Sequence, residues 1–200
     1  HPTRIHQKTK EEIMRGQELF EEGQRLFMSG RVKESIDQFT QALAAGHDEI
    51  PTRLSRGAAY INTQEFDKAL VDLDAVLTGE PDNERAHYYR GIVLLNLEEF
   101  AKAASDFDQT IAANPQRGPA FLGRGLALSE IGKEDEALQD FKTAVAHSTV
   151  EVESFVHSFG NARTKFGQTM ALLEGERGSL RQVMTPDEVA KLQKWMEPEK

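Results

Sequence analysis

Three arginines and three aspartates recur at a fixed spacing and form the most ordered set of charged residues in the chain. Each arginine stands directly before a glycine, and each aspartate follows its arginine by sixteen residues. The arginines are Arg56, Arg90 and Arg124, and the aspartates are Asp72, Asp106 and Asp140. A guanidinium matches a carboxylate in shape and charge, so the pattern predicts either ion pairs between helices or an arginine ladder for an acidic ligand. We favour the ion pairs, because an arginine beside a close helix crossing is partly buried and needs a partner.

No other residues form a catalytic or metal-binding arrangement. The sequence contains no glycine-rich phosphate loop, no HExxH or GxSxG motif and no EF-hand loop. No pair among the six histidines has the spacing of metal ligands on a predicted helix, and there is no cysteine. We therefore expect a protein that is not an enzyme, with no catalytic residues, no metal and no cofactor.

The composition is that of a folded protein with an acidic surface. The 200 residues are 38% hydrophobic and carry a formal net charge of -9. An acidic surface repels nucleic acid and anionic lipid, so neither is an expected partner. No apolar run reaches the length of a membrane span, so we expect no membrane insertion and a cytoplasmic protein. Because the chain begins at His1 rather than Met, we expect a fragment or a processed chain, and an exported chain that has lost its targeting segment is the alternative.

A repeat of 34 residues runs through the chain. A glycine marks each copy, a small residue follows twelve positions later, and a large apolar residue follows four positions after that. The three series are Gly23, Gly57, Gly91 and Gly125; Ser35, Ala69, Ala103 and Ala137; and Phe39, Leu73, Phe107 and Phe141. Pro81 and Pro115 close the second and third copies. This pattern resembles the tetratricopeptide repeat, which has a Gly in its first helix and an Ala, a Phe and a closing Pro in its second.

The resemblance implies an all-α fold, a right-handed superhelical array of four helical hairpins with C-terminal capping helices. The four repeats span residues 16–49, 50–83, 84–117 and 118–151. Within each hairpin the glycine faces the small residue where the two helices cross, so that their backbones approach closely. We predict helix throughout residues 10–150, except at turns near 30, 48–50, 63–64, 80–83, 97–98, 114–118 and 131–133.

Flanking regions complete the predicted organisation. Residues 1–15 form an N-terminal arm and an extension of the first helix. Residues 152–184 form a capping helix and a loop, because an apolar stripe at helical spacing follows the last repeat and would cover the exposed end of the array. Residues 185–200 form a short amphipathic helix that starts at Thr185-Pro186.

The resemblance also implies where a partner binds, because in this family the first helices of the repeats line a concave groove that holds peptides. Transferred to this sequence, the peptide-binding residues are Phe20, Gln24, Phe27, Leu54, Ala58, Ile61, Asn62, Tyr88, Ile92, Leu95, Asn96, Leu122 and Leu126. The predicted centre comprises Tyr88, Ile92, Leu95 and Leu122. Asn62 and Asn96 are predicted to form hydrogen bonds with the ligand backbone.

Most of these residues are apolar, and such a stripe requires a cover. Four covers remain open: a helix or extended segment of a partner, the chain's own helix 189–196, the same helix from a second copy, or packing between neighbouring first helices. The second copy would give a homodimer through the C-terminal helix. The family's clamp for acidic tails needs basic residues that only Arg85 supplies, so we reject that function.

We therefore predict a protein–protein interaction module, an adaptor or assembly scaffold, that binds a peptide or amphipathic helix of another protein in its groove. One alternative is a holding chaperone that shields an apolar client segment. Another is a regulatory tetratricopeptide part of a larger enzyme.

Overall fold

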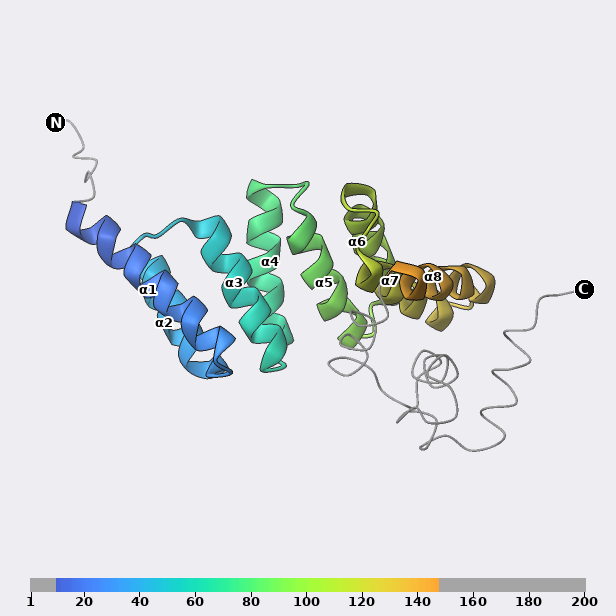
Figure 1. Ribbon diagram of the computed structural model, residues 1–200, viewed down its shortest axis with the longest axis horizontal. Coiled ribbons are helices and arrows are strands. Elements are labelled where there is room, and N and C mark those ends of the chain that lie inside the picture. Colours follow the sequence, from blue (N-terminus) through green and yellow to red (C-terminus); the bar gives the residue numbers. More distant parts are fainter. Residues whose placement is uncertain (1–9, 148–200) are drawn as a thin grey trace, which may run out of the picture. The chain divides into compact units, whose positions relative to one another are not determined.

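The computed structural model describes residues 10–147, and every regular element in this range is an α-helix joined to the next by a short turn (Figure 1). The helices are α1 (Lys10–Met28), α2 (Val32–Ala44), α3 (Glu49–Asn62), α4 (Phe66–Gly79), α5 (Glu84–Asn96), α6 (Phe100–Ala113), α7 (Gly118–Glu130) and α8 (Glu134–His147). The predicted all-α repeat array is confirmed over this range. The predicted C-terminal helices and most of the N-terminal arm lie outside the described residues. None of the helices within residues 10–147 has the length and apolar character to cross a membrane.

The chain divides into two compact units, residues 1–97 and residues 98–200. In the first unit α1 packs against α2, and α3 packs against α4, as two antiparallel hairpins. Helix α3 also contacts both α1 and α5, so these three helices lie in one row, with α2 and α4 packed against it. In the second unit α7 packs against both α6 and α8.

Close helix crossings explain why glycine and a large apolar residue recur in register. A Cβ atom added at Gly125 would lie 2.5 Å from Cε1 of Phe141 and 3.1 Å from the carbonyl oxygen of Ala137. The Phe141 ring fills this space and is 1% exposed. At Gly57 the added atom would lie 3.2 Å from Cγ of Leu73, which is fully buried. Glycine therefore lets the second helix of each hairpin place its large side chain against the backbone of the first helix.

The turn after each first helix contains one residue in the left-handed backbone conformation. These residues are Gly30 (φ 80°), Gln64 (φ 61°), Glu98 (φ 60°) and Gly132 (φ 81°), each 34 positions after the last. In three of these turns the backbone amide of the following residue donates a hydrogen bond of 2.8–2.9 Å to a carbonyl oxygen of the first helix. The donor and acceptor residues are Arg31 and Leu26, Glu65 and Tyr60, and Lys133 and Leu128. Because Gln64 and Glu98 carry a Cβ atom, their turns are strained in a way that the two glycine turns are not.

One turn lies earlier than the sequence predicted. The prediction placed it at 48–50, whereas the turn occupies residues 45–48 and α3 begins at Glu49. The side chain of Asp48 accepts a hydrogen bond from the amide of Ile50 at 3.2 Å and caps the helix. Pro51 lies in the first turn of α3, where its missing N–H would have no partner within the helix. The prediction was wrong because this cap starts the helix before the proline.

Candidate peptide-binding surface

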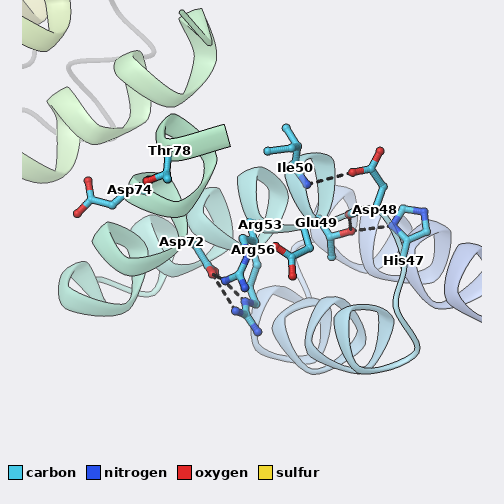
Figure 2. A network of polar contacts seen from close by, with 10 residues as sticks. His47, Asp48, Glu49, Ile50, Arg53, Arg56, Asp72, Asp74 and Thr78 are labelled. Atoms are coloured by element: carbon cyan, nitrogen blue, oxygen red, sulfur yellow. Dashed lines mark hydrogen bonds and ion pairs between the residues drawn. The ribbon is translucent and has the colours of Figure 1, made fainter. Parts of the chain in front are cut away.

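The repeat arginines and aspartates join the two helices of a hairpin, as Figure 2 shows for α3 and α4. Nε and Nη2 of Arg56 donate to the two carboxylate oxygens of Asp72 at 2.7 and 2.8 Å. Nη1 of Arg53 donates to the same carboxylate at 3.1 Å. The hydrogen bonds to Asp72 raise the pKa of the Arg56 guanidinium, although its own burial opposes the rise. With Asp72 only 1% exposed, this is a buried, bidentate ion pair rather than a surface contact.

The same pair recurs between α7 and α8 in the second unit. Nε and Nη2 of Arg124 each donate to a carboxylate oxygen of Asp140 at 2.8 Å. Burial raises the pKa of the Asp140 carboxyl, while the hydrogen bonds from Arg124 act in the opposite direction. The predicted ion pairs of Asp72 and Asp140 are therefore confirmed. Arg90 and Asp106 belong to different units, and their pairing stays a prediction.

Each repeat arginine also reaches back to the second helix of the preceding repeat. Nη1 of Arg56 donates to the hydroxyl of Thr40 at 3.0 Å. In the next two repeats the acceptor is a carboxylate: Nη1 of Arg90 donates to Asp74 at 2.8 Å, and Nη1 of Arg124 donates to Asp108 at 2.7 Å. Every acceptor stands sixteen residues before its arginine. The sequence prediction missed Asp74 and Asp108, although their separation of 34 residues was the available signal. Arginines engaged on both sides favour the ion-pair interpretation over a ladder for an acidic ligand.

The predicted peptide-binding residues fall into three classes of exposure. The buried ones are Leu54, Ile61, Ile92, Leu122 and Leu126, each at most 9% exposed. The half-buried ones are Phe20, Phe27, Ala58, Tyr88 and Leu95, and the exposed ones are Gln24, Asn62 and Asn96. The buried side chains offer a ligand little surface, because they already fill spaces inside the protein. Leu122 and Leu126 lie on α7, which belongs to the second unit.

The accessible predicted residues of the first unit lie at helical spacing on the row formed by α1, α3 and α5. We call them the odd-helix face: Gln24, Phe27, Ala58, Asn62, Tyr88, Leu95 and Asn96. Phe20 is left out because its ring stacks on His47, with centroids 4.5 Å apart. Met28 is 78% exposed and stands 34 residues before Asn62, so the repeat itself could have added it to the prediction.

The odd-helix face combines amide groups with partly covered apolar side chains. The amide nitrogen of Asn96 donates to the carbonyl oxygen of Ile92 at 2.8 Å, so its Oδ1 is the atom suited to accept a bond from a ligand. The rings of Tyr88 and Tyr89 lie 5.7 Å apart. Within residues 10–147, no three histidine or carboxylate side chains are placed to hold a metal ion. The face therefore presents amide groups and partly exposed apolar side chains.

Comparison with known families supports the repeat geometry. A family profile described as "Tetratricopeptide repeat" matches residues 54–117 and 90–149, a range that contains all three repeat arginines. The chain is a tetratricopeptide-repeat protein. No curated protein matches this tetratricopeptide-repeat protein.

Solved structures share the fold of this tetratricopeptide-repeat protein. MamA from Desulfovibrio magneticus RS-1, spanning residue 41 to its end, aligns with a TM-score of 0.66 and 17% identity, over 90% of this chain and 94% of that chain. YrrB, described as a TPR protein with an unusual peptide-binding site, aligns with a TM-score of 0.61 and 20% identity, over 71% of this chain and 73% of that chain. At these identities the likeness establishes the fold alone.

Proposed function

We propose that this protein is a protein–protein interaction module that binds a peptide or helix of a partner on its odd-helix face. The observation that carries the proposal is the repetition of accessible groups along one row of helices. Asn62 and Asn96 are both exposed at the last residues of α3 and α5, and Met28 is exposed at the last residue of α1. A periodic row of this kind suits a ligand whose own groups repeat, as those of a polypeptide do.

The residues of α5 give the proposed surface its strongest contacts. Tyr88 and Leu95 are half-buried, so a ligand that covers them removes further apolar surface from water, at roughly 25 cal/mol per Å². Asn62 and Asn96 flank this region with amide groups that can bond a peptide backbone. Central apolar contacts bordered by hydrogen bonds are the usual source of affinity in protein interfaces.

The family supports a role in holding partners together, and the proposal includes no catalytic role for this chain. The fold shared with YrrB, which is described as having a peptide-binding site, supports a peptide as the ligand. An adaptor or assembly scaffold is the function consistent with a surface that offers amides and apolar side chains but no group placed for chemistry.

Site-directed photocrosslinking tests the proposal with a partner of any identity. A benzophenone side chain would replace Asn62 or Asn96 in the full chain, and in a control it would replace Val71, which is 67% exposed on α4. We expect one protein to be captured at both asparagine positions and not at Val71. Capture of the same proteins at all three positions would contradict the proposal.

The captured partner then allows an affinity measurement. Leu95→Asp should weaken binding by about 2 kcal/mol, or roughly thirtyfold in Kd, because it places a charge in the proposed apolar contact. Val71→Asp makes the same chemical change on the other row of helices and should leave Kd unchanged. Asn96→Ala is a milder variant that keeps the test informative if Leu95→Asp disturbs folding. Wild-type affinity in both odd-helix variants would place the binding site elsewhere.

A further inference from the structure

His47 lies in the turn that leads into α3, next to Asp48 (Figure 2). Its backbone packs closely against α1, since a Cβ atom added at Gly16 would lie 3.3 Å from both the Cβ atom and the backbone nitrogen of His47. Its ring stacks on Phe20 of α1, with centroids 4.5 Å apart and an angle of 17° between the planes. The contact between α1 and the start of α3 is therefore built around one imidazole ring.

Both ring nitrogens of His47 have a polar neighbour, and the two neighbours lie on different helices. Nδ1 lies 2.7 Å from Oγ1 of Thr52 on α3, and Nε2 lies 2.9 Å from Oε1 of Gln17 on α1. Thr52 is fully buried, so this contact is shielded from water. A neutral imidazole carries one N–H donor, whereas an imidazolium carries two. The roles of the two neighbours therefore decide which form of the ring fits.

The Thr52 hydroxyl can only accept a hydrogen bond from His47. It donates its own proton to the carbonyl oxygen of Asp48 at 2.6 Å, and a carbonyl oxygen cannot donate. Nδ1 of His47 must therefore carry a proton to bond Thr52.

The orientation of the Gln17 amide is fixed in the same way. Its Nε2 donates to the carboxylate of Glu21 at 2.7 Å. Turning the amide over would set its oxygen against that carboxylate, with no proton between them. Oε1 of Gln17 therefore faces His47 as an acceptor, and Nε2 of the His47 ring must also carry a proton.

The contacts form one chain of hydrogen bonds with an acceptor at each end. We name this chain the His47 latch, and its members in order are Glu21, Gln17, His47, Thr52 and the Asp48 carbonyl. All four bonds form together only when the ring of His47 is an imidazolium. A neutral ring has one proton too few, so one of the four bonds is lost.

The charged groups of the neighbouring helices suit a protonated ring. On α1, helical geometry places Glu12 and Glu21 beside the face that touches His47. Arg15 and Glu18 point to the opposite side of that helix. The last two turns of α2, residues 38–44, carry no charge. Acidic groups therefore predominate on the side of α1 that His47 meets.

The start of α3 adds two carboxylates and one cation. Asp48 and Glu49 are exposed, and the Arg53 guanidinium donates to Asp72 of α4 at 3.1 Å. The face of the Phe20 ring also attracts a cation. The ring of His47 therefore meets acceptors, carboxylates and an aromatic face, all of which interact favourably with an imidazolium.

We propose that the His47 latch is a protonation-controlled contact, which fastens α1 to α3 when both ring nitrogens carry protons and loosens when one proton is lost. Ile13 and Met14 are 59% and 52% exposed, so the first turns of α1 bury little apolar surface that could replace a lost bond. The folded chain offers the protonated ring bonds that the unfolded chain lacks. This stabilisation is therefore fully present below about pH 6.5, where histidines usually titrate, and is lost as the pH rises above it.

Thermal unfolding of the full chain near pH 5.5 and near pH 8.5, on either side of about pH 6.5, tests the proposal. Gln17→Ala removes one acceptor at an exposed position. We expect it to lower Tm by about 3 °C near pH 5.5, the effect of about one hydrogen bond, and by less than about 1 °C near pH 8.5. Gln24→Ala makes the same change about two turns further along α1, and its effect on Tm should not depend on pH. An effect of Gln17→Ala that is equal at both pH values would overturn the proposal.

Thr52 supplies a matched pair of backgrounds for the same measurement. In Thr52→Val the hydroxyl is gone, so a neutral ring has its single proton free for Gln17, and Gln17→Ala should lower Tm equally at both pH values. In Thr52→Ser the hydroxyl remains, and the pH dependence should persist. Persistence of the pH dependence in both backgrounds, or its loss in both, would overturn the assigned chain of bonds.

Nuclear magnetic resonance of the imidazole groups in isotope-labelled protein gives a readout that does not depend on stability. We expect two N–H signals from His47, both slow to exchange with water, near pH 5.5, and one near pH 8.5, on either side of about pH 6.5. His47→Gln identifies these signals among those of the other histidines. Rapid exchange of either proton near the lower pH would show that its nitrogen does not donate to the assigned partner, and would overturn the proposal. Neither readout involves a ligand, so the latch and the odd-helix face are tested separately.

Discussion

Replacing Gly125 with alanine tests how closely the two helices of the last described hairpin approach each other. The new Cβ atom would lie 2.5 Å from Cε1 and 2.8 Å from Cδ1 of Phe141, and 3.1 Å from the carbonyl oxygen of Ala137. Because the Phe141 ring is 1% exposed, it has no room to turn away towards solvent. The added methyl group must therefore push α7 and α8 apart.

Two opposing contributions set the magnitude. Overpacking of a buried contact costs about 1–3 kcal/mol. Alanine in place of glycine within a helix returns about 0.5–1 kcal/mol through lower backbone entropy in the unfolded chain. We expect Gly125→Ala to lower the free energy of unfolding by about 1–2 kcal/mol. In the matched variant Gly57→Ala the nearest atom is Cγ of Leu73 at 3.2 Å, and the two contributions should cancel to within about 0.5 kcal/mol.

Urea titration monitored by far-ultraviolet circular dichroism measures this difference. The two variants are comparable when the dependence of the unfolding free energy on urea concentration, the m-value, is the same for both. Hydrogen exchange of the α7 and α8 amides shows whether the loss is local, as expected in an array whose repeats contact only their neighbours. If Gly125→Ala is as stable as the wild type while Gly57→Ala is destabilised, the ordering of the two crossings is wrong. The overlap at Phe141 would then not limit the approach of the helices.

Three further predictions concern the ion pairs and turns of the first unit. Asp72→Asn should lower the free energy of unfolding by about 3 kcal/mol in the same urea titration, because it breaks a buried ion pair. Asp74→Asn changes a carboxylate that is 58% exposed, and should lower the free energy of unfolding by less than about 1 kcal/mol. Gln64→Gly should raise the free energy of unfolding by about 0.5–1 kcal/mol by relieving the left-handed backbone, and a lowered Tm would contradict the strain. Glu65→Gln should lower Tm at neutral pH, because a hydrogen bond from Lys68 lowers the pKa of the Glu65 carboxyl and so stabilises the folded protein. This stabilisation is lost as the pH falls through the lowered pKa. A Tm difference between variant and wild type that persists in acid would contradict the prediction.

The sequence could predict what the repeat spacing alone determines. Gly125 and Phe141 recur in register, so their contact follows from the period, and the pairing of Arg56 with Asp72 follows in the same way. The spacing could not predict which apolar residues stay accessible. Ile92 and Leu95 lie on one face of α5, yet the first is 1% exposed and the second is half-buried. The packing of neighbouring helices decides that difference, and a one-dimensional pattern does not contain it.

The reach of the arginines was missed for a related reason. A guanidinium has donors on several sides, so one side chain can bond two carboxylates on different helices. The spacing of sixteen residues predicted a single partner for each arginine. Arg124 instead bonds both Asp140 in its own hairpin and Asp108 in the hairpin before it. Only the distance between the helices shows that both acceptors are in reach.

The acceptors placed sixteen residues before each arginine make the internal repeats interchangeable. Removing residues 75–108, one full period of 34, would place Asp74 sixteen residues before Arg124, so the joint between the hairpins would be restored with the same two residue types. The deletion removes one of the two ion pairs, Arg90–Asp74 and Arg124–Asp108, and leaves the remaining arginine with a carboxylate partner, so we expect the shortened chain still to unfold cooperatively. The first joint is different, because Thr40 offers a hydroxyl where later repeats offer a carboxylate. If the first repeat were inserted elsewhere in the array, the arginine of the repeat after it would find the Thr40 hydroxyl instead of a carboxylate.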